Sequence, residues 1–325
     1  MRVRPRRNRK GSAIRKMIEE THLSPSNLIY PLFLLEGDLA KQAIESLPGI
    51  FRLNHSDLER EVEACIELGV STFVLFPVVP EKYKDKTGSY SVSRDNFYLE
   101  SIRQLREKFP HIVLMSDVAM DPYSSDGHDG LVENGQILND KTLPILGDMA
   151  VAQAQAGIDI IGPSDMMDGR VGFIRDSLDT NGFEDTSIMS YTAKYASAFY
   201  GPFRAALDSA PKAGDKKTYQ MNPANKTEAL IEADLDTAEG ADFLMVKPAL
   251  CYLDVIHMLK ESSALPITAY NVSGEFAMLK AACERGWLDY ETAMPEMLLS
   301  IRRAGADGIL TYFAKDFAQL YKSKM

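Results

Sequence analysis

Two lysines stand near the ends of consecutive apolar runs of the sequence. Lys194 lies in SIMSYTAKY (187–195) and Lys247 lies in DFLMVKPAL (242–250). Burial and a neighbouring like charge both lower the pKa of a lysine. One such lysine is as readily a rim residue whose stem packs on apolar surface. Two on neighbouring strands, about 4.8 Å apart, predict neutral amines that form Schiff bases with ketones.

An acidic, turn-rich stretch, DVAMDPYSSDGHDG (117–130), follows an earlier apolar run and contains Asp117, Asp121 and Asp129. Carboxylates at this density suit Mg²⁺ or general acid–base catalysis, and Asx turns and helix caps are the structural alternative. The spacing does not fit an EF-hand loop. The five histidines are scattered without an HxH or HxxxH pair, which argues against a histidine zinc site.

A long segment rich in Gly, Pro and Lys, residues 201–223, separates the two lysine-bearing runs. Loops of this length are usually functional lids or disordered. We expect Arg204, Lys216 and Lys217 to reach over the site and hold a substrate carboxylate, with Arg204 as the bidentate partner. A solvated charged loop is the alternative.

The elements that must position these residues form one repeated theme, a short apolar run followed by a segment with helical spacing. The eight runs are 29–35, 71–79, 112–120, 158–164, 187–195, 242–250, 266–274 and 307–313. Eight such units predict an α/β protein with a (β/α)8 TIM barrel, whose active site lies at the carboxyl ends of the strands. A doubly wound sheet is the alternative, but no GxGxxG or Walker A segment follows the early runs.

Helix boundary signals accompany the repeat. Ser56 is the expected N-cap of the first helix after a run, and Glu59 would complete its capping box. Four helix candidates end at a glycine that precedes the next run, and these glycines are expected just past the helix ends. They are Gly69, Gly157, Gly240 and Gly305.

Composition limits the class of protein. The 325 residues are 45% hydrophobic and 25% charged, which is typical of a globular chain and excludes bulk disorder. No apolar run approaches the roughly 20 residues of a membrane span. We expect residues 26–325 to form the barrel and residues 1–25 to form an N-terminal arm. Cys65, Cys251 and Cys283 form no CxxC pair, which indicates a reducing compartment.

Charge is unevenly distributed along the chain. The first ten residues hold six of the 36 basic residues, and the remainder carries thirty basic against 46 acidic residues. The acidic body disfavours a nucleic-acid surface. The basic leader favours an arm that docks on another subunit, with a nucleic-acid arm or a targeting remnant as alternatives.

Several long motifs resemble one family. They are SDVAMDPYSSDGHDG, PSDMMDGRVGFIR, MSYTAKYASAFYGPFR, YQMNPANKTEALIEADLDTAEGADFLMVKPALCYLDVI, YNVSGEFAML and RAGADGILTYFAKD. The chain resembles the porphobilinogen synthase (5-aminolevulinate dehydratase) family from about residue 5 onward. The resemblance implies a (β/α)8 barrel and a lyase that joins two molecules of 5-aminolevulinate asymmetrically, with loss of two waters, in tetrapyrrole (heme and chlorophyll) biosynthesis.

The resemblance also implies roles for individual residues. It makes Lys247 and Lys194 the Schiff-base lysines, one for each substrate. Arg204 and Lys216 would bind the carboxylate of one substrate, and Ser273 and Tyr312 that of the other. Ser164, the last residue of the fourth run, joins the substrate-binding set. Asp121 and Asp129 would either hold a metal during turnover or hold a substrate amine and move protons, with Asp117 alongside.

The aspartates separate two branches of the family. In zinc-dependent members the positions matching Ala119, Asp121 and Asp129 are cysteines that ligate a catalytic zinc. A soft thiolate site is absent here, so no catalytic zinc is expected. The chain resembles the magnesium-responsive branch, in which Glu232 matches the ligand of an allosteric Mg²⁺.

The resemblance further implies a homo-octamer whose N-terminal arm wraps a neighbouring subunit, with neither nucleic acid nor a membrane as a partner. The leader is not long, Ser-rich and acid-poor, which favours a bacterial cytoplasm over a plastid stroma. Two alternatives remain: a class I aldolase-type barrel, which leaves Lys194 without a role, and a barrel that binds a metabolite or partner without catalysis.

Overall fold

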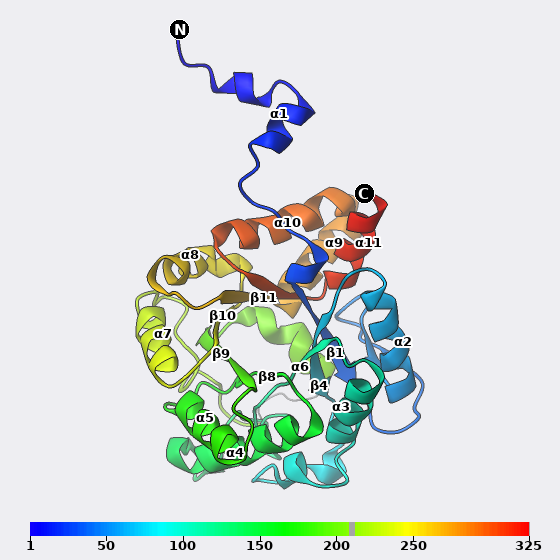
Figure 1. Cartoon of the computed structure of the whole chain (residues 1–325). Coiled ribbons are helices and arrows are strands. Elements are labelled where there is room, and N and C mark those ends of the chain that lie inside the picture. The colour runs from blue at the N-terminus through cyan, green and yellow to red at the C-terminus, as the bar shows by residue number, and fades with distance from the viewer. Residues whose placement is uncertain (208–211, 325) are drawn as a thin grey trace.

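The computed structural model describes residues 1–207 and 212–324. Its centre is a closed barrel of eight parallel strands surrounded by helices (Figure 1). The strands are β1 (Leu28–Leu34), β4 (Thr72–Pro77), β5 (Val113–Met115), β8 (Ile160–Ile161), β9 (Ser187–Lys194), β10 (Phe243–Lys247), β11 (Ile267–Asn271) and β12 (Gly308–Thr311). Pairing of Leu28 with Ile309 closes the ring. Each predicted run overlaps one strand, so the predicted TIM barrel is confirmed.

One helix follows each strand on the outside of the barrel. These helices are α2 (His55–Ile66), α3 (Phe97–Lys108), α4 (Asn139–Ala156), α5 (Arg170–Thr180), α7 (Glu228–Ala238), α8 (Leu253–Ser262), α10 (Tyr290–Ala304) and α11 (Ala314–Ser323). The strands are buried along most of their length, because the helices cover one face and the barrel interior covers the other. No helix in the described part of the chain is long and apolar enough to cross a bilayer.

The helix boundary signals were partly right. The four glycines predicted past helix ends all have positive φ, from 89° at Gly69 to 126° at Gly305. The predicted N-cap was wrong, because Asn54 caps α2 and accepts a hydrogen bond from the Asp57 amide at 2.8 Å. Ser56 lies inside the first turn, where its hydroxyl donates to Asn54 Oδ1 at 3.0 Å.

Short elements lie outside the eight-fold repeat. β2 (Gln42–Ala43) and β3 (Phe51–Leu53) extend the sheet beside β1, and β6 (Val132–Glu133) pairs with β7 (Gln136–Ile137) as a hairpin. Residues 201–223 were expected to form a loop, but 201–207 form helix α6 (Gly201–Leu207). Residues 208–211 of that segment, and residue 325, lie outside the described residues.

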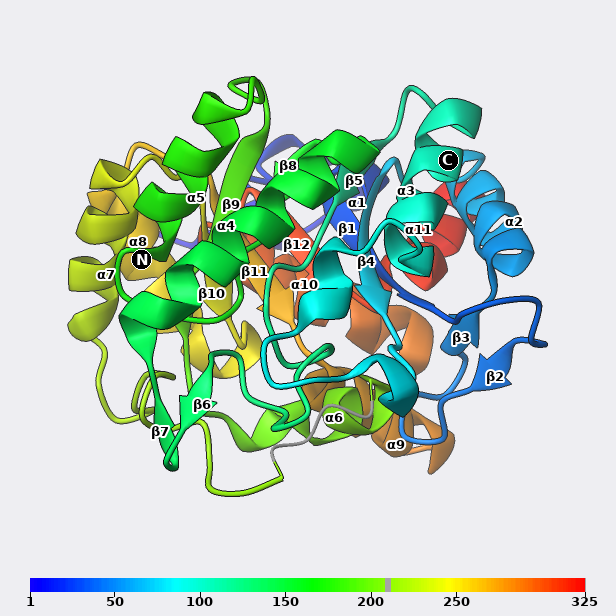
Figure 2. The ribbon, with the colours of Figure 1, turned by 90° about the horizontal axis from the view of Figure 1, so that it is seen from below.

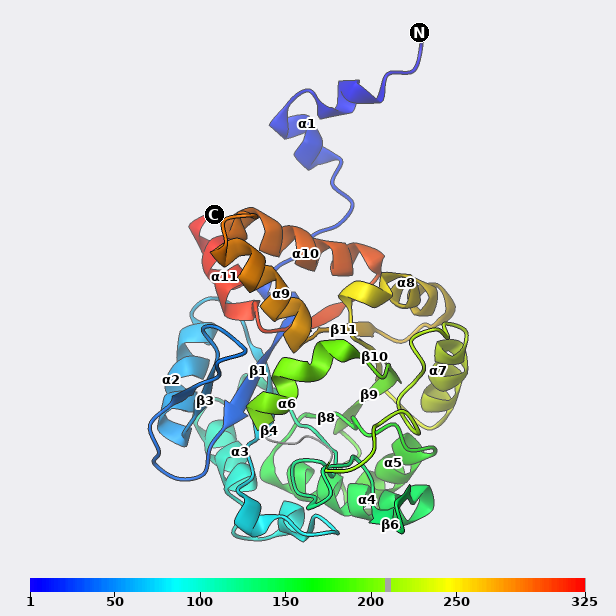
Figure 3. The ribbon, with the colours of Figure 1, turned by 180° about the vertical axis from the view of Figure 1, so that it is seen from behind.

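Helix α6 and helix α9 (Ser273–Glu284) cover one end of the barrel. Figure 2 shows α6 and the β6–β7 hairpin at the same end, and Figure 3 shows α6 in front of the strands. The Phe203 ring of α6 lies 5.9 Å from the Phe33 ring and 5.1 Å from the Phe76 ring. Because these rings come from β1 and β4, α6 closes the mouth over the strand ends.

The N-terminal segment stands away from the barrel (Figure 1). It contains a 3-10 helix, η1 (Pro5–Arg9), and α1 (Ser12–Met17), and neither has a buried residue. Within this single chain, residues 5–17 therefore do not pack against the barrel.

Candidate active site

The two lysines face each other at the carboxyl ends of adjacent strands. Lys194 ends β9 and Lys247 ends β10, and the two residues are direct partners in the parallel ladder. Each is only 6% exposed. Residues that pair across a sheet point to the same face, so both amines enter the same closed mouth.

Aromatic rings surround the Lys247 amine. Its Nζ lies 5.1 Å from the ring centroid of Tyr191, 5.3 Å from Tyr200, 5.1 Å from Phe203 and 4.6 Å from Tyr270. Burial and the charge of Lys194 lower the pKa of Lys247 to about 7, although nearby aspartates act in the opposite direction. A large fraction of this amine is thus unprotonated near neutral pH, as a nucleophile requires.

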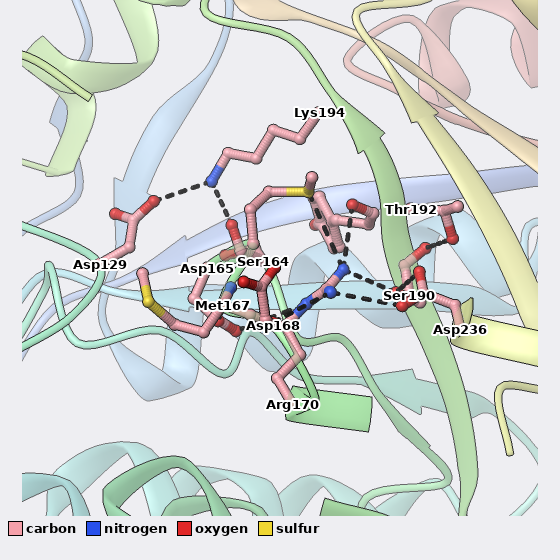
Figure 4. A network of polar contacts seen from close by, with 12 residues as sticks. Asp129, Ser164, Asp165, Met167, Asp168, Arg170, Ser190, Thr192, Lys194 and Asp236 are labelled. Atoms are coloured by element: carbon pink, nitrogen blue, oxygen red, sulfur yellow. Dashed lines mark hydrogen bonds and ion pairs between the residues drawn. The ribbon is translucent and has the colours of Figure 1, made fainter. Parts of the chain in front are cut away.

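Oxygen atoms hold the Lys194 amine. Its Nζ lies 3.1 Å from Asp129 Oδ2 and also donates to the Ser164 carbonyl, as Figure 4 shows. Ser164 is 5% exposed and follows β8. The loop after β8, which contains Ser164, and the acidic stretch, which contains Asp129, therefore both reach the end of β9.

A second lysine shares the Asp129 carboxylate. Lys216 Nζ contacts Asp129 Oδ1 and lies 3.2 Å from Asp121 Oδ2. Burial alone would raise the pKa of Asp129, but the ammonium groups of Lys194 and Lys216 lower it to about 2. Burial would lower the pKa of Lys216, and its two carboxylate partners raise it instead. Asp129 is therefore a buried, charged link between β9 and the segment over the mouth.

The predicted lid contributes Lys216 but not Lys217 to the mouth. The side chain of Lys217 is 75% exposed and lies 3.5 Å from Asp215. Arg204 lies in α6 and is partly exposed, and it makes no hydrogen bond or ion pair with the described part of the chain. The structure thus brings Lys216 to the lysines and leaves Arg204 on the covering helix.

Asp117 is a buried carboxylic acid beside the lysines. It lies beyond the end of β5, which is shorter than the predicted run. Burial and the charge of Asp121 raise the pKa of Asp117 to about 6, against the effects of Ser164, Lys247 and Lys194. Its Oδ1 accepts no hydrogen bond from the described residues. Asp117 can therefore gain or lose a proton close to neutral pH.

Ser273 and Tyr312 lie on the opposite side of the mouth. Ser273 is the first residue of α9, and its hydroxyl oxygen accepts a hydrogen bond from the Phe203 amide at 3.0 Å. The hydroxyl oxygens of Tyr312 and Tyr270 are 2.9 Å apart. Burial raises the pKa of Tyr312, so its hydroxyl stays neutral and can donate to a carboxylate. The two residues thus offer an anchor separate from Lys216.

Glu232 is remote from the lysines. It lies on the outer helix α7, where burial raises the pKa of its carboxyl to about 7, against the attraction of Arg170 and with repulsion from Asp236. No group of three or more His, Cys, Asp or Glu side chains converges for a metal within the described residues. A single carboxylate with water ligands still fits the usual Mg²⁺ arrangement.

Sequence reasoning missed the aromatic cage of Lys247 and a buried arginine, Arg170. The cage rings lie in β9, β11, α6 and the 3-10 helix η5 (Ala198–Tyr200), so no local pattern brings them together. The only local signal for Arg170 was its place within the PSDMMDGRVGFIR motif. In the structure it is the first residue of α5 and is buried.

Known proteins resemble the chain over almost its full length. The family model described as delta-aminolevulinic acid dehydratase matches residues 2–320. The chloroplastic delta-aminolevulinic acid dehydratase of Physcomitrium patens is 58% identical, over 98% of this chain and 74% of its own length. The Chlamydia pneumoniae dehydratase is 51% identical, over 98% of this chain and 96% of its own length.

A solved structure agrees with the sequence relatives. The Toxoplasma gondii ME49 delta-aminolevulinic acid dehydratase (porphobilinogen synthase), solved with its reaction product porphobilinogen, superposes with a TM-score of 0.98. It is 50% identical and covers 100% of this chain and 93% of its own. The chain with two register-paired lysines in its barrel mouth therefore belongs to the delta-aminolevulinic acid dehydratase family.

Proposed function

We propose that this enzyme joins two molecules of 5-aminolevulinate into porphobilinogen with Lys247 and Lys194 as its two Schiff-base lysines. The observation that carries the assignment of residues is the direct pairing of two buried lysines at the ends of β9 and β10. Two ketones need two amines, and the mouth holds both within one closed space, which favours reaction between the two adducts.

Each covalent step uses groups present in the mouth. The lone pair of a neutral lysine Nζ attacks the ketone carbon, the nitrogen loses two protons and the carbonyl oxygen gains two, and this oxygen leaves as water, so an imine remains. Asp117, with a pKa of about 6, is placed to transfer protons beside Lys247. Exclusion of water by α6 and the segment around Lys216 favours the imine over its hydrolysis.

The two substrate carboxylates would bind at two separate anchors. We place one on Lys216 and Arg204 and the other on Ser273 and Tyr312. The hydroxyls of Ser273 and Tyr312 support the second anchor because both are buried and neutral. At the first anchor a substrate carboxylate would compete with Asp121 for the ammonium group of Lys216.

Incubation with 5-aminolevulinate followed by acidic dimethylaminobenzaldehyde tests the reaction. Formation of a coloured pyrrole is expected, whereas an aldolase-type or a purely binding barrel would give none. Borohydride reduction during turnover, followed by peptide mass mapping, should find adducts at Lys247 and Lys194. Absence of any adduct at Lys247 would overturn the assignment.

We further propose that Mg²⁺ binds at Glu232 and acts on assembly, and that the catalytic site uses no zinc. Ala119, Asp121 and Asp129 offer no thiolate at the mouth. A cation at Glu232 would offset the burial and the repulsion from Asp236 that together raise the pKa of its carboxyl. Mg²⁺ should increase the sedimentation coefficient of the protein, and Glu232→Gln should remove this response. Asp234→Asn, an exposed change on the same helix, is the matched control.

The arm of residues 1–25 is proposed to join subunits of a homo-octamer. The exposed basic residues of η1 and the absence of a buried residue in η1 and α1 support this assignment. Deletion of residues 1–20 should lower the molar mass in light scattering, and an intact octamer would contradict it. We propose a cytoplasmic location for this chain, whose relatives include both a bacterial dehydratase and chloroplastic ones.

A further inference from the structure

The ladder between β9 and β10 changes register just before the two lysines. Ser190 pairs with Leu244, and the next recorded pair joins Ala193 to Val246. β9 therefore advances three residues while β10 advances two. One extra residue in one strand is a β-bulge, which bends the strand and redirects the side chains that follow.

The bulge decides which way Lys194 points. Side chains alternate between the two faces along a strand, and a slip of one residue moves a side chain to the other face. In an unbroken ladder Lys247 would pair with Ala193, and Lys194 would point away from the barrel mouth. In the structure Lys194 pairs with Lys247. The site with two amines therefore depends on this bulge.

Arg170 binds the bulged segment from the outer side of the sheet. It is 2% exposed, and its Nη2 donates to the Ser190 hydroxyl at 2.9 Å and to the Tyr191 carbonyl at 3.3 Å. Its Nη1 donates to Asp236 Oδ1 at 3.3 Å, and the Ser190 hydroxyl donates to Asp236 Oδ2 at 2.6 Å. The three side chains form a closed ring beside the bulge, at a point where a bulge disrupts the ladder.

The same arginine also holds the loop that contacts Lys194 (Figure 4). Its Nη1 donates to the Met167 carbonyl at 3.4 Å, and its Nε lies 3.9 Å from Asp165 Oδ2. Asp165 Oδ1 accepts a hydrogen bond from the Met167 amide at 2.7 Å. The neighbouring Ser164 carbonyl accepts from the Lys194 amine. Arg170 therefore fixes both the strand that carries Lys194 and the loop that receives its amine.

We propose that Arg170 is a positioning residue for Lys194, which it keeps in register with Lys247 by holding the β9 bulge. The proposal rests on the proposed function for the role of Lys194. Arg170 touches neither amine, so its effect acts through Ser190, Tyr191 and the 164–167 loop. Loss of the arginine should therefore affect covalent capture at Lys194 and spare capture at Lys247.

The test compares the two lysines within one protein. Wild type and Arg170→Lys are incubated with 5-aminolevulinate, reduced with borohydride and mapped by mass. Lysine keeps the charge but loses the planar fork that reaches Ser190, Tyr191 and Asp236 together. The ratio of the adduct at Lys194 to that at Lys247 should fall about tenfold, because small displacements of a reacting group are costly.

Two further variants keep the result interpretable. Arg170→Met with Asp236→Asn removes both charges of this ion pair, so that Asp236 is not left as an unpaired buried carboxylate, and it should lower the ratio in the same way. Arg175→Met is the matched control, because Arg175 lies on the same helix and binds Asp179 at 2.7 Å without reaching the bulge. This control should leave the ratio within twofold of wild type.

The outcomes separate the proposal from its alternatives. An unchanged ratio in folded Arg170→Lys would overturn the positioning role. Equal loss of both adducts, in proportion to the folded fraction measured by circular dichroism, would show a purely structural role and would also overturn it. A wild-type protein that forms no adduct at either lysine would instead refute the proposed function itself.

Discussion

Lys247 and Lys194 are paired in register but lie in different surroundings. Four aromatic rings lie 4.6 to 5.3 Å from the Lys247 amine, and no carboxylate within the described residues forms an ion pair with it. Lys194 is held by Asp129 and the Ser164 carbonyl. The same residue type is thus free to react in one position and anchored in the other.

The difference suggests a division of labour between the two amines. With a pKa of about 7, Lys247 can attack a ketone without first breaking an ion pair. Lys194 must leave Asp129 before it can do so, and a charged substrate amine could take its place beside that carboxylate. We therefore expect Lys247 to capture substrate faster than Lys194.

Removal of each lysine gives the largest expected effects. Lys247→Ala and Lys194→Ala should each lower porphobilinogen formation by a factor on the order of 10⁴, because each removes a proposed covalent nucleophile. Lys194→Ala should still form the reduced adduct at Lys247, as measured by borohydride trapping. Loss of that adduct in Lys194→Ala would show that the two surroundings do not act independently.

The position of the Lys194 amine depends on one carboxylate, that of Asp129. Asp129→Asn leaves Lys194 and Lys216 facing each other without their shared charge, and removing one partner of a buried ion pair costs about 3–5 kcal/mol. The free energy of unfolding should fall by that amount in urea titrations, and kcat should fall roughly 100-fold. Asp121→Asn is the matched change, because Lys216 keeps Asp129. An equal loss in Asp121→Asn would argue against a special role for Asp129.

The sequence was sufficient to predict the eight-stranded barrel and the position of two lysines at the ends of neighbouring strands. Continuous apolar runs in β9 and β10 predicted buried strands, and a lysine inside such a run stands out against its neighbours. The bulge that aligns the two lysines was not predictable, because Tyr191 and Thr192 have the same strand-forming character as the residues around them. The hydrogen-bonded ring of Arg170, Ser190 and Asp236 could not be predicted either, because Asp236 lies 66 residues away from Arg170 along the chain.

The rate of adduct formation at Lys247 should depend on pH. Lys247 has a folded pKa of about 7 against 10.5 in the unfolded chain. The rate of adduct formation at Lys247 should therefore rise roughly tenfold per pH unit below 7 and level off above it. Trapping with borohydride at short times from pH 5.5 to 8.5 measures this profile. A rate that still rises tenfold per unit above pH 8 would contradict the lowered pKa.

The same group links pH to stability. Because the folded pKa of Lys247 is lowered, the unfolded chain binds more protons between pH 10.5 and about 7. Wild type should lose stability as the pH falls through that window. Lys247→Met should be more stable than wild type at pH 7, by an amount on the order of a few kcal/mol that shrinks toward pH 10. Urea titrations at both pH values measure the difference.

The smallest effect should come from a cage hydroxyl. The Tyr200 hydroxyl donates to the Tyr195 carbonyl at 2.7 Å and to the Lys247 carbonyl at 3.1 Å, away from the amine. Tyr200→Phe removes these bonds and keeps the ring, so it should lower the free energy of unfolding by about 1 kcal/mol. Adduct formation at Lys247 should change less than threefold, a difference of about 0.7 kcal/mol in the barrier.

Tyr200→Ala separates the ring from the hydroxyl. It opens the cage to water, which weakens the burial that lowers the pKa of Lys247. The midpoint of the pH profile for adduct formation should therefore move upward in Tyr200→Ala and stay in place in Tyr200→Phe. If both variants shifted the midpoint equally, the hydroxyl bonds to the strand ends, and not the apolar ring faces, would be what keeps Lys247 different from Lys194.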